Sequence, residues 1–244
     1  MKIYWLTGLL CSSAPLAEAQ QNLFNAPSGD ITIPKELFYQ QQINFYSGSS
    51  WESKSHFVYG LGKNWDAGIN LVDLPIQWSG GGIIPTNDQT RPYFPVWMVT
   101  LQKQWGLSDR WDLNIGTQAG SNFGGAFGNT SLSYWNYAGF RHQMKKGYFI
   151  GGLYQTTDTY AGEGVDLAGV WFGFELHLSD KWYLMGDFIS GNNKKSSSTM
   201  GVVYNLSDRI QLCSAGLFSI PNPSTSGGFV LELNVFTYDF RKAE

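Results

Sequence analysis

Charged residues, cysteines and long hydrophobic runs are all scarce in this 244-residue sequence. Only 14% of the residues are charged, whereas soluble domains carry about 25%. The formal net charge of −3 offers no basic surface of the kind that binds nucleic acid. No apolar run approaches the roughly 20 residues that a membrane-spanning helix needs, and the mean hydropathy is negative. These features exclude a helical membrane protein and an ordinary nucleic-acid-binding domain.

Aromatic residues and glycine are abundant instead, at 16% of the chain and 29 copies respectively. The length fits one large all-β domain or two domains of ordinary size. Many aromatics, few charges and no long apolar run together favour a chain whose apolar residues occupy every second position. Glycine is a poor helix former, so its frequency disfavours long helices. The composition therefore favours an all-β fold.

The first 19 residues have the pattern of a secretory signal peptide. Lys2 is followed by an apolar stretch, residues 3–10, and then by Ala17-Glu18-Ala19, which matches an A-x-A cleavage site. The alternative is a buried first strand. Cleavage after Ala19 would leave one of the two cysteines, so the mature chain would form no internal disulfide. We therefore predict three parts: a signal peptide (1–19), a polar periplasmic lead (20–33) and a transmembrane β-barrel (34–244).

The chain from residue 34 onward divides into apolar or alternating segments, separated by turn-forming residues. No helical pattern of useful length interrupts them. Twelve segments are predicted to be strands: 36–47, 54–62, 67–78, 95–106, 111–122, 131–144, 148–160, 165–178, 182–191, 197–206, 210–220 and 228–240.

Strict two-residue alternation is clearest over residues 166–179. Val170 and Phe172 share an apolar face, and the alternate residues Trp171 and Glu175 share the other face. A soluble sandwich would bury its apolar face and carry Lys and Glu outside. The polar faces here are instead rich in neutral Gln, Asn, Thr, Ser and Gly. Such faces suit a confined wet lumen, which places the apolar faces toward lipid.

A Ser-Asp-(Arg/Lys) sequence recurs in three predicted turns, beginning at Ser108, Ser179 and Ser207. Ser and Asp favour turns because their side chains bind nearby backbone groups. The unequal spacing excludes a solenoid repeat. Short predicted connections alternate with mostly longer ones, which is typical of barrels with short periplasmic turns and long outer loops. The sequence therefore predicts an all-β fold, a closed antiparallel up-and-down transmembrane β-barrel of about 12 strands.

Two regions leave the strand count open. Residues 79–94 and 121–135 have weaker strand patterns, so ten and fourteen strands are the alternatives. Residues 79–94 are expected to form the longest outer loop and to fold into the lumen. The sheet is expected to close because unpaired strand edges are costly in hydrocarbon.

Tryptophans are expected to mark the two membrane interfaces. The set beside the short turns comprises Trp65, Trp105, Trp111 and Trp182. The set nearer the long loops comprises Trp51, Trp78, Trp97 and Trp135. These sets predict two aromatic girdles.

The C-terminal sequence resembles the terminal strand of bacterial outer-membrane barrels, because NVFTYDF ends on the aromatic Phe240. Together with the signal peptide, the alternating strands and the LSD(R/K) turns, it makes the chain resemble Gram-negative outer-membrane channel families. The similarity to the phenol-degradation meta-pathway outer-membrane proteins lies in residues 185–223, which read MGDFISGNN…STMGVVYNLSDRIQLCSAGLFSIPNP. This resemblance implies a small-solute channel and transfers no functional residues.

Polar residues on the alternate faces are candidates for lining the lumen. The principal candidates are Gln42, His56, Asp73, Gln102, Asn114, Gln118, Glu175, His177, Asp187 and Glu232. Arg141 is a further candidate, but acidic candidates outnumber basic ones. They predict a narrow pore or binding lumen that mildly favours cations. The alternative is that these groups only hydrogen-bond across a plugged interior.

The function expected from this pattern is passive uptake or efflux of a small polar or amphipathic solute across the bacterial outer membrane. The alternatives are an outer-membrane lipid hydrolase and a closed structural or adhesion barrel. Glu175 has the spacing to orient His177, but no Ser forms a recognisable motif with a histidine, so we expect no enzyme. No metal or other cofactor is expected, because the His and Cys residues lack ligand spacing. The expected partners are a solute in the lumen, outer-membrane lipid and the barrel-assembly machinery, without nucleic acid.

Overall fold

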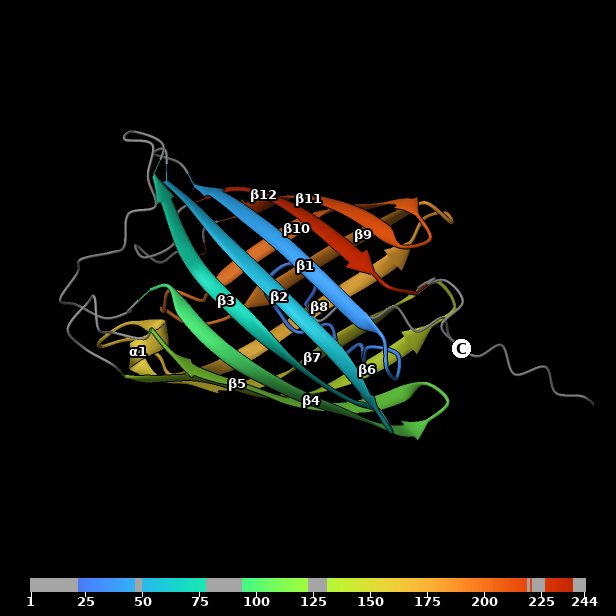
Figure 1. The fold of residues 1–244 in the computed structure, drawn as a ribbon, viewed down its shortest axis with the longest axis horizontal. Helices are drawn as coiled ribbons and strands as arrows, with labels where there is room; N and C mark the ends of the chain where they lie inside the picture. The colour runs from blue at the N-terminus through green and yellow to red at the C-terminus, as the bar shows by residue number, and fades with distance from the viewer. Residues whose placement is uncertain are drawn as a thin grey trace, which may run out of the picture.

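A computed structural model describes residues 22–46, 50–77, 94–122, 131–218, 220 and 227–238. These residues form a closed barrel in which all strand pairs are antiparallel (Figure 1). The strands are β1 (Leu37–Tyr46), β2 (Ser50–Gly62), β3 (Trp65–Gln77), β4 (Val96–Ser108), β5 (Trp111–Ser121), β6 (Leu132–Met144), β7 (Gly147–Thr156), β8 (Ala168–His177), β9 (Trp182–Ile189), β10 (Ser197–Ser207), β11 (Ile210–Phe218) and β12 (Gly228–Phe236). The predicted fold class and the count of twelve strands are confirmed.

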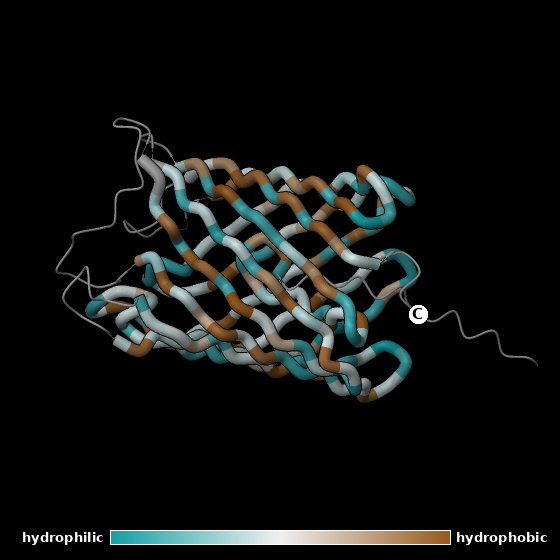
Figure 2. Tube along the Cα trace, in the orientation of Figure 1, coloured by the Kyte–Doolittle hydropathy of each residue, from teal (hydrophilic) through white to brown (hydrophobic). Residues whose placement is uncertain are grey.

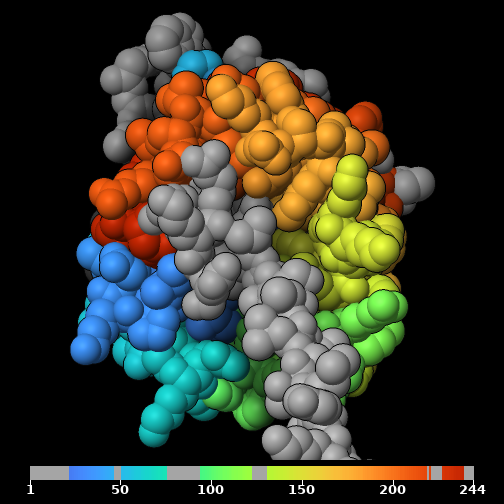
Figure 3. Space-filling view, turned by 90° about the vertical axis from the view of Figure 1, so that its right-hand side faces the viewer, coloured from blue at the N-terminus to red at the C-terminus, as the bar shows by residue number. Residues whose placement is uncertain are grey.

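Each strand pairs with the next one along the chain, and β1 pairs with β12 to close the barrel. In the end-on view of Figure 3, the colours accordingly run round the rim in chain order. The pairing of Tyr39 with Val235 is one point of this closing seam. Closure leaves no strand edge in the sheet, as a barrel in hydrocarbon requires.

Short and long connections alternate along the chain, as predicted, so the barrel has a short-turn end and a long-loop end (Figure 1). The long connection after β7 contains the one-turn helix α1 (Asp158–Ala161), where the sequence pattern predicts strand as far as residue 160. The helix forms because the backbone N–H groups of Tyr160 and Ala161 donate to the Thr157 carbonyl oxygen at 3.1 and 2.9 Å. Most of the predicted inward-folding loop, residues 79–93, lies outside the described residues.

The three Ser-Asp-(Arg/Lys) sequences form tight turns at the short-turn end. The side-chain oxygen of Ser179 accepts hydrogen bonds from the backbone N–H groups of Lys181 and Trp182, at 3.3 and 3.1 Å. Ser108 and Ser207 accept equivalent bonds from the residue two positions later. The turn chemistry predicted from the sequence is therefore present in all three copies.

The outward faces of the strands are apolar and the inward faces are mostly polar, as the alternating colours along the strands of Figure 2 illustrate. On β8 the side chains of Val170 and Phe172 are 47% and 54% exposed, whereas Trp171 between them is 1% exposed. Exposed apolar side chains recur on neighbouring strands, for example Val99, Leu153 and Leu231. An apolar belt around a closed barrel is the surface of a membrane-spanning β-barrel.

The tryptophans beside the short turns confirm one predicted girdle, because all four are exposed on the outer wall. The second girdle is predicted wrongly at Trp135. Its side chain is buried in the lumen and stacks on Tyr154, with 4.2 Å between ring centroids. The reason is strand parity, since Trp135 shares the inward face of β6 with Ser133 and Tyr137. Trp97 is exposed as predicted, and Trp78 lies outside the described residues.

Residues 22–33, here called the inner segment, lie inside the barrel, whereas the sequence pattern predicts a polar lead outside it. Leu23 and Phe24 are almost fully buried, as are Ser28 and Asp30. The segment reaches the short-turn end at Lys35, whose backbone N–H donates to the Gly60 carbonyl oxygen at 2.7 Å. The apolar residues of the inner segment are the physical reason for the difference, because they bury surface against the lumen wall.

Among the described residues, no helix has both the length and the apolar character needed to cross a membrane.

Candidate functional site: a filled lumen with a chamber at the loop end

The half of the inner segment nearer the long-loop end is a tight loop, which one carboxylate fixes to β9. The backbone N–H of Leu23 donates to the Ala26 carbonyl oxygen at 2.8 Å, which closes the loop. The backbone N–H groups of Phe24, Asn25 and Ala26 all point to Oδ2 of Asp187, at 3.0, 2.5 and 2.9 Å. Hydrogen bonds to an ionised acceptor are about twice as strong as neutral ones. Asp187 therefore holds the loop in the middle of the lumen.

The half of the inner segment nearer the short-turn end is held by an ion pair. The carboxylate of Asp30 contacts the guanidinium group of Arg141, which lies 3.8 Å above the ring centroid of Tyr148. The Tyr148 hydroxyl donates to Oδ2 of Asp30 at 3.3 Å, and the Gln102 side chain donates to the Asp30 carbonyl oxygen at 2.6 Å. Asp30 and Arg141 are both buried, so their charges compensate each other away from water.

Two glycines make room for this segment. At Gly173 of β8, an added Cβ would lie 2.1 Å from Cδ1 of Leu23, so the wall at this point is shaped for the leucine. Gly29 has a φ of +76°, a backbone conformation that other residues adopt rarely. It packs against Asn114, whose Nδ2 would lie 2.8 Å from an added Cβ. Inner segment and lumen wall are therefore complementary in shape.

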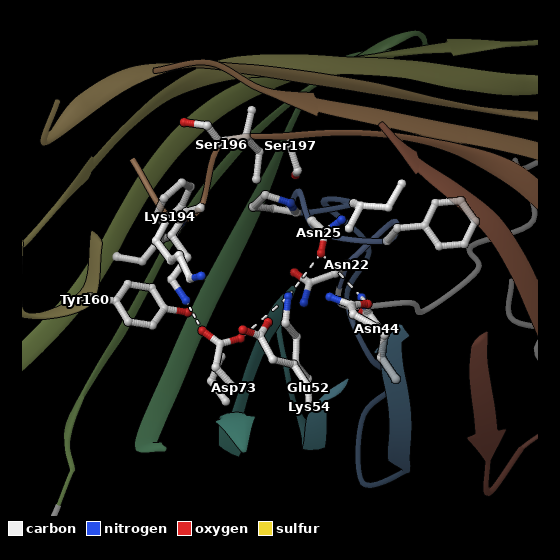
Figure 4. Close-up of a pocket in the computed structure, with 18 of the residues that line it drawn as sticks. Asn22, Asn25, Asn44, Glu52, Lys54, Asp73, Tyr160, Lys194, Ser196 and Ser197 are labelled. Atoms are coloured by element: carbon white, nitrogen blue, oxygen red, sulfur yellow. Dashed lines mark hydrogen bonds and ion pairs between the residues drawn. The ribbon is translucent and has the colours of Figure 1, made fainter. Parts of the chain in front are cut away.

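A cavity of about 130 Å³ lies beside the inner segment, on the side of the long-loop end (Figure 4). We call it the loop-end chamber. Its floor is formed by Asn22, Phe24, Asn25 and Pro27 of the inner segment. Its polar wall includes Gln42, Asn44, Tyr46, Glu52, Lys54, His56, Asp73, Gln118, Lys194, Lys195, Ser196 and Ser197, and its apolar wall includes Val72, Trp135, Tyr160, Ile189 and Leu217. The chamber thus offers both polar and apolar contacts to a small solute.

A β-bulge places Asp73 in the chamber. In the β2–β3 pair the register shifts so that Lys54 faces both Val72 and Asp73, and Asp73 has a φ of 54°. A bulge leaves two neighbouring residues on the same face of a strand, and both Val72 and Asp73 are buried toward the lumen.

Charges of both signs meet in the chamber. Nζ of Lys54 lies 3.1 Å from Oδ1 of Asn25 and 3.7 Å from Oδ1 of Asp73. The hydroxyl of Tyr46 donates to Oε2 of Glu52 at 2.7 Å. Two carboxylates, Glu52 and Asp73, thus share the chamber with three lysines, as Figure 4 shows for the labelled residues. The acidic excess predicted for the lumen does not extend to this chamber.

Lys195, from the connection between β9 and β10, completes the chamber. Its ammonium group forms an ion pair with Asp73 and lies over the rings of Tyr160 and Phe94, at 3.7 and 4.4 Å from their centroids. Burial, followed by the nearby charge of Asp73, raises the pKa of the Tyr160 hydroxyl well above its ordinary value. The Tyr160 ring therefore stays neutral and keeps the electron-rich face that attracts a cation.

The structure places the ten predicted lumen residues on the inward face of the barrel. Nine are buried, and His177 is half-buried at the short-turn end. Gln42, His56, Asp73 and Gln118 line the loop-end chamber. Gln102, Asn114 and Asp187 contact the inner segment. Glu232 accepts a hydrogen bond from the wall residue Asn234 at 2.9 Å, and Glu175 lies 3.0 Å from Nε2 of His177.

Sequence reasoning missed the inner segment, Lys54, Lys195 and Tyr160. Lys54 lies two residues before the predicted residue His56 and therefore shares its inward face. Strand alternation could have identified it. Lys195 and Tyr160 lie in connections, where no periodicity predicts direction. Their meeting with Asp73 depends on the closed barrel and on chain segments far apart in sequence.

Comparisons with known proteins show the same fold. The KdgM porin, solved both alone and in complex with disordered oligogalacturonate, matches with a TM-score of 0.55 and 5% sequence identity, over 82% of this chain and 98% of that chain. An outer membrane channel from Pseudomonas putida F1 matches with a TM-score of 0.46 and 10% identity, over 82% of this chain and 92% of that chain. No protein-family model and no curated protein sequence matches the chain. The chain therefore shares the barrel fold of an outer-membrane porin.

Proposed function

We propose that this protein is an outer-membrane channel or binding barrel for the passive uptake or efflux of a small polar or amphipathic solute. The observation that carries the proposal is the loop-end chamber, a polar cavity inside a barrel whose outer wall is apolar. The porin fold and the resemblance of residues 185–223 to the phenol-degradation meta-pathway outer-membrane proteins agree with this function.

The number of strands supports a narrow passage. Side chains roughly fill a barrel of about eight strands, whereas about 16–18 strands leave an open aqueous channel. This barrel has twelve strands, and the inner segment occupies the room between the chamber and the short-turn end. We therefore infer that the inner segment sets the width of the passage, and that solute moves past it only when it shifts.

The first test is conductance in planar lipid bilayers. The wild-type barrel is compared with a variant that lacks residues 22–33 and with Asp187→Asn, which weakens the acceptor of three backbone N–H groups. We expect low conductance in the wild type, several-fold higher conductance in the deletion variant, and an intermediate value for Asp187→Asn. Glu232→Gln is the control, because it changes a lumen carboxylate that hydrogen-bonds the wall residue Asn234.

Folding of each variant is checked by the slower gel migration after heating that is typical of barrels. If the deletion variant folds and conducts no better than the wild type, the inner segment does not limit the passage. If neither conducts, the channel part of the proposal is wrong and only the binding function remains.

Orientation in the outer membrane is tested by labelling intact cells. We expect the long loops to face the outside and the short turns to face the periplasm. Lys194 and Asp180 are exposed at opposite ends of the barrel. A cysteine at residue 194 should therefore react with an impermeant reagent on whole cells, and one at residue 180 should react only after lysis. Reaction of both on whole cells would contradict the orientation.

We also propose that the Glu175–His177 pair has a structural role and that the protein is not a lipid hydrolase. The His177 ring stacks on Tyr183, with 4.3 Å between centroids, at the short-turn end of β8. That stacking, and not a nucleophile, accounts for the position of the ring. Fatty-acid release from phospholipid vesicles, abolished by His177→Ala, would overturn this proposal.

A further inference from the structure

The loop-end chamber contains a complete binding site for an ammonium group, and a side chain of the protein occupies it. We call this site the ammonium cage and define it as Asp73, Phe94 and Tyr160. The Nζ atom of Lys195 forms an ion pair with Asp73 and lies over both rings, 3.7 Å from the Tyr160 centroid and 4.4 Å from the Phe94 centroid. A carboxylate combined with two ring faces is how proteins bind cationic ammonium ligands.

The cage is built from parts of the chain that are distant in sequence. Asp73 comes from the bulge in β3, Phe94 precedes β4 and Tyr160 comes from α1, and all three side chains are buried. Lys195 reaches them from the connection between β9 and β10, on the other side of the barrel from β3. The three cage residues therefore form a preorganised surface, and Lys195, which occupies it, has a long, flexible side chain.

Lys195 can leave the cage without disturbing its own loop. The loop backbone is fixed by other groups: Oδ1 of Asn193 accepts the N–H groups of Lys195 and Ser196 at 2.9 and 3.1 Å, and the Ser196 hydroxyl donates to the Ser190 carbonyl oxygen at 3.0 Å. The lysine stem has four carbons and ends in a strongly hydrated charge. Rotation of this side chain toward the loop-end water is thus sufficient to vacate the cage.

The charge that remains favours a cation. With Lys195 turned away, Asp73 loses its ion-pair partner in the cage, while Lys54 stays 3.7 Å from its Oδ1 atom and Lys194 stays exposed at the edge of the chamber. A monovalent ammonium solute would take the place of the Lys195 charge beside Asp73, whereas an anionic solute would meet the carboxylates of Asp73 and Glu52. Tyr46, Asn44 and Asn25 lie in the same chamber and offer hydroxyl and amide groups to the rest of the solute.

We propose that the loop-end chamber binds small solutes that carry an ammonium group, with hydroxyl or amine substituents, and that they displace Lys195 from the ammonium cage. Lys195 acts as a tethered competitor that keeps the cage filled when solute is scarce. This inference rests on the proposed function, because it names the solute class of the same chamber.

Competition by Lys195 makes a specific prediction about affinity. If the cage is vacant only about one tenth of the time, its ligand binds about tenfold more weakly than it would to a permanently vacant cage. Removal of the lysine side chain should therefore improve binding of an ammonium solute by about tenfold or more. A lysine that binds the solute directly would have the opposite effect.

The experiment is calorimetric titration of the full barrel in detergent with three probes of similar size: ethanolamine, ethylene glycol and glycolate. They differ in carrying a positive charge, no charge or a negative charge. The variants are Lys195→Ala and Asp73→Asn. Asparagine tolerates the positive φ of residue 73, so the second variant keeps the bulge. Lys181→Ala is the control, because it makes the same change of charge in a turn at the opposite end.

We expect ethanolamine to bind in preference to both other probes. Its affinity should rise about tenfold or more in Lys195→Ala, stay unchanged in Lys181→Ala, and fall below detection in Asp73→Asn. Weaker or unchanged ethanolamine binding in Lys195→Ala would overturn the proposal. Preference for glycolate, lost in Lys195→Ala, would also overturn it and would make Lys195 a direct ligand for anions.

The result of this titration can be distinguished from the result of the conductance test of the proposed function. If ethanolamine fails to bind but deletion of the inner segment raises conductance, the channel stands and the ammonium class is wrong. If ethanolamine binds as expected but no variant conducts, the chamber is a binding site in a barrel that does not conduct.

Discussion

The outward face of the barrel and its lumen face are built from alternate residues of the same strands, yet they differ in how their side chains are stabilised. Outward residues such as Val170 contact one uniform environment, lipid, and need no particular partner. Inward residues such as Asp187 and Arg141 each need a specific partner, because burial of an unpaired charge is costly. The difference means that the outer wall tolerates many apolar sequences, whereas the lumen depends on individual contacts.

Phe172→Arg should have the largest effect on the outer face. It places a charge near the middle of the apolar belt, at a cost of about 2–4 kcal/mol in free energy of unfolding. Unfolding in urea, followed by tryptophan fluorescence in lipid vesicles, measures the loss. Phe172→Leu is the matched control and should cost less than half as much. An equal effect of the two substitutions would mean that residue 172 does not contact hydrocarbon.

Asp187→Ala should have the largest effect on the lumen face. It removes the acceptor of three backbone N–H groups, and hydrogen bonds to charged groups contribute about 1.5–3 kcal/mol each. The strands remain paired, so the loss should appear in the inner segment and not in the barrel. Hydrogen exchange is expected to accelerate at Phe24, Asn25 and Ala26 and to stay slow at residues of β9. Acceleration throughout β9 would show that Asp187 stabilises the wall instead.

Gly173→Ala tests the fit between the wall and the inner segment. The added Cβ would lie 2.1 Å from Cδ1 of Leu23, so one of them must move. Overpacking of this kind costs about 1–3 kcal/mol, and Leu23→Ala in the same chain should recover most of it. Failure of the second substitution to compensate would mean that Leu23 does not occupy this position in the membrane.

Ser179→Ala should have the smallest effect, at the short-turn end where lipid and lumen faces meet. It removes the acceptor of the backbone N–H groups of Lys181 and Trp182. The turn is exposed to water, so we expect a loss of about 0.5–1.5 kcal/mol and no change in conductance. A change in conductance without loss of stability would show that this turn influences the lumen.

The outer wall could be predicted from the sequence almost completely. Two-residue alternation identifies Val170 and Phe172 as lipid-facing, and the Ser-Asp-(Arg/Lys) turns fix where strands end. Both signals are local, so no knowledge of distant residues is needed. The same alternation also placed nine of the ten lumen candidates in buried positions.

The lumen could be predicted only in part, because its contacts join residues far apart in sequence. The bulge at Val72 and Asp73 reverses the parity of β3, so alternation counted back from Asp73 overlooks the buried residues Asp66 and Asn70. The ion pair of Asp30 with Arg141 joins residues 111 positions apart. No local pattern reveals that residues 22–33 enter the barrel.

Apolar strand faces contact lipid while the inner segment fills the lumen, and one experiment measures both placements. The most direct measurement is the access of molecular oxygen and of an aqueous quencher to a spin label in lipid vesicles. The label is placed at residue 172 or at residue 25, with Cys213 replaced by Ser because it is a free thiol. We predict high oxygen access and low aqueous access at residue 172. At residue 25 we predict low oxygen access, because this residue lies on the floor of the polar chamber, away from hydrocarbon. Strong aqueous access at residue 172, or oxygen access at residue 25 as high as at residue 172, would contradict these placements.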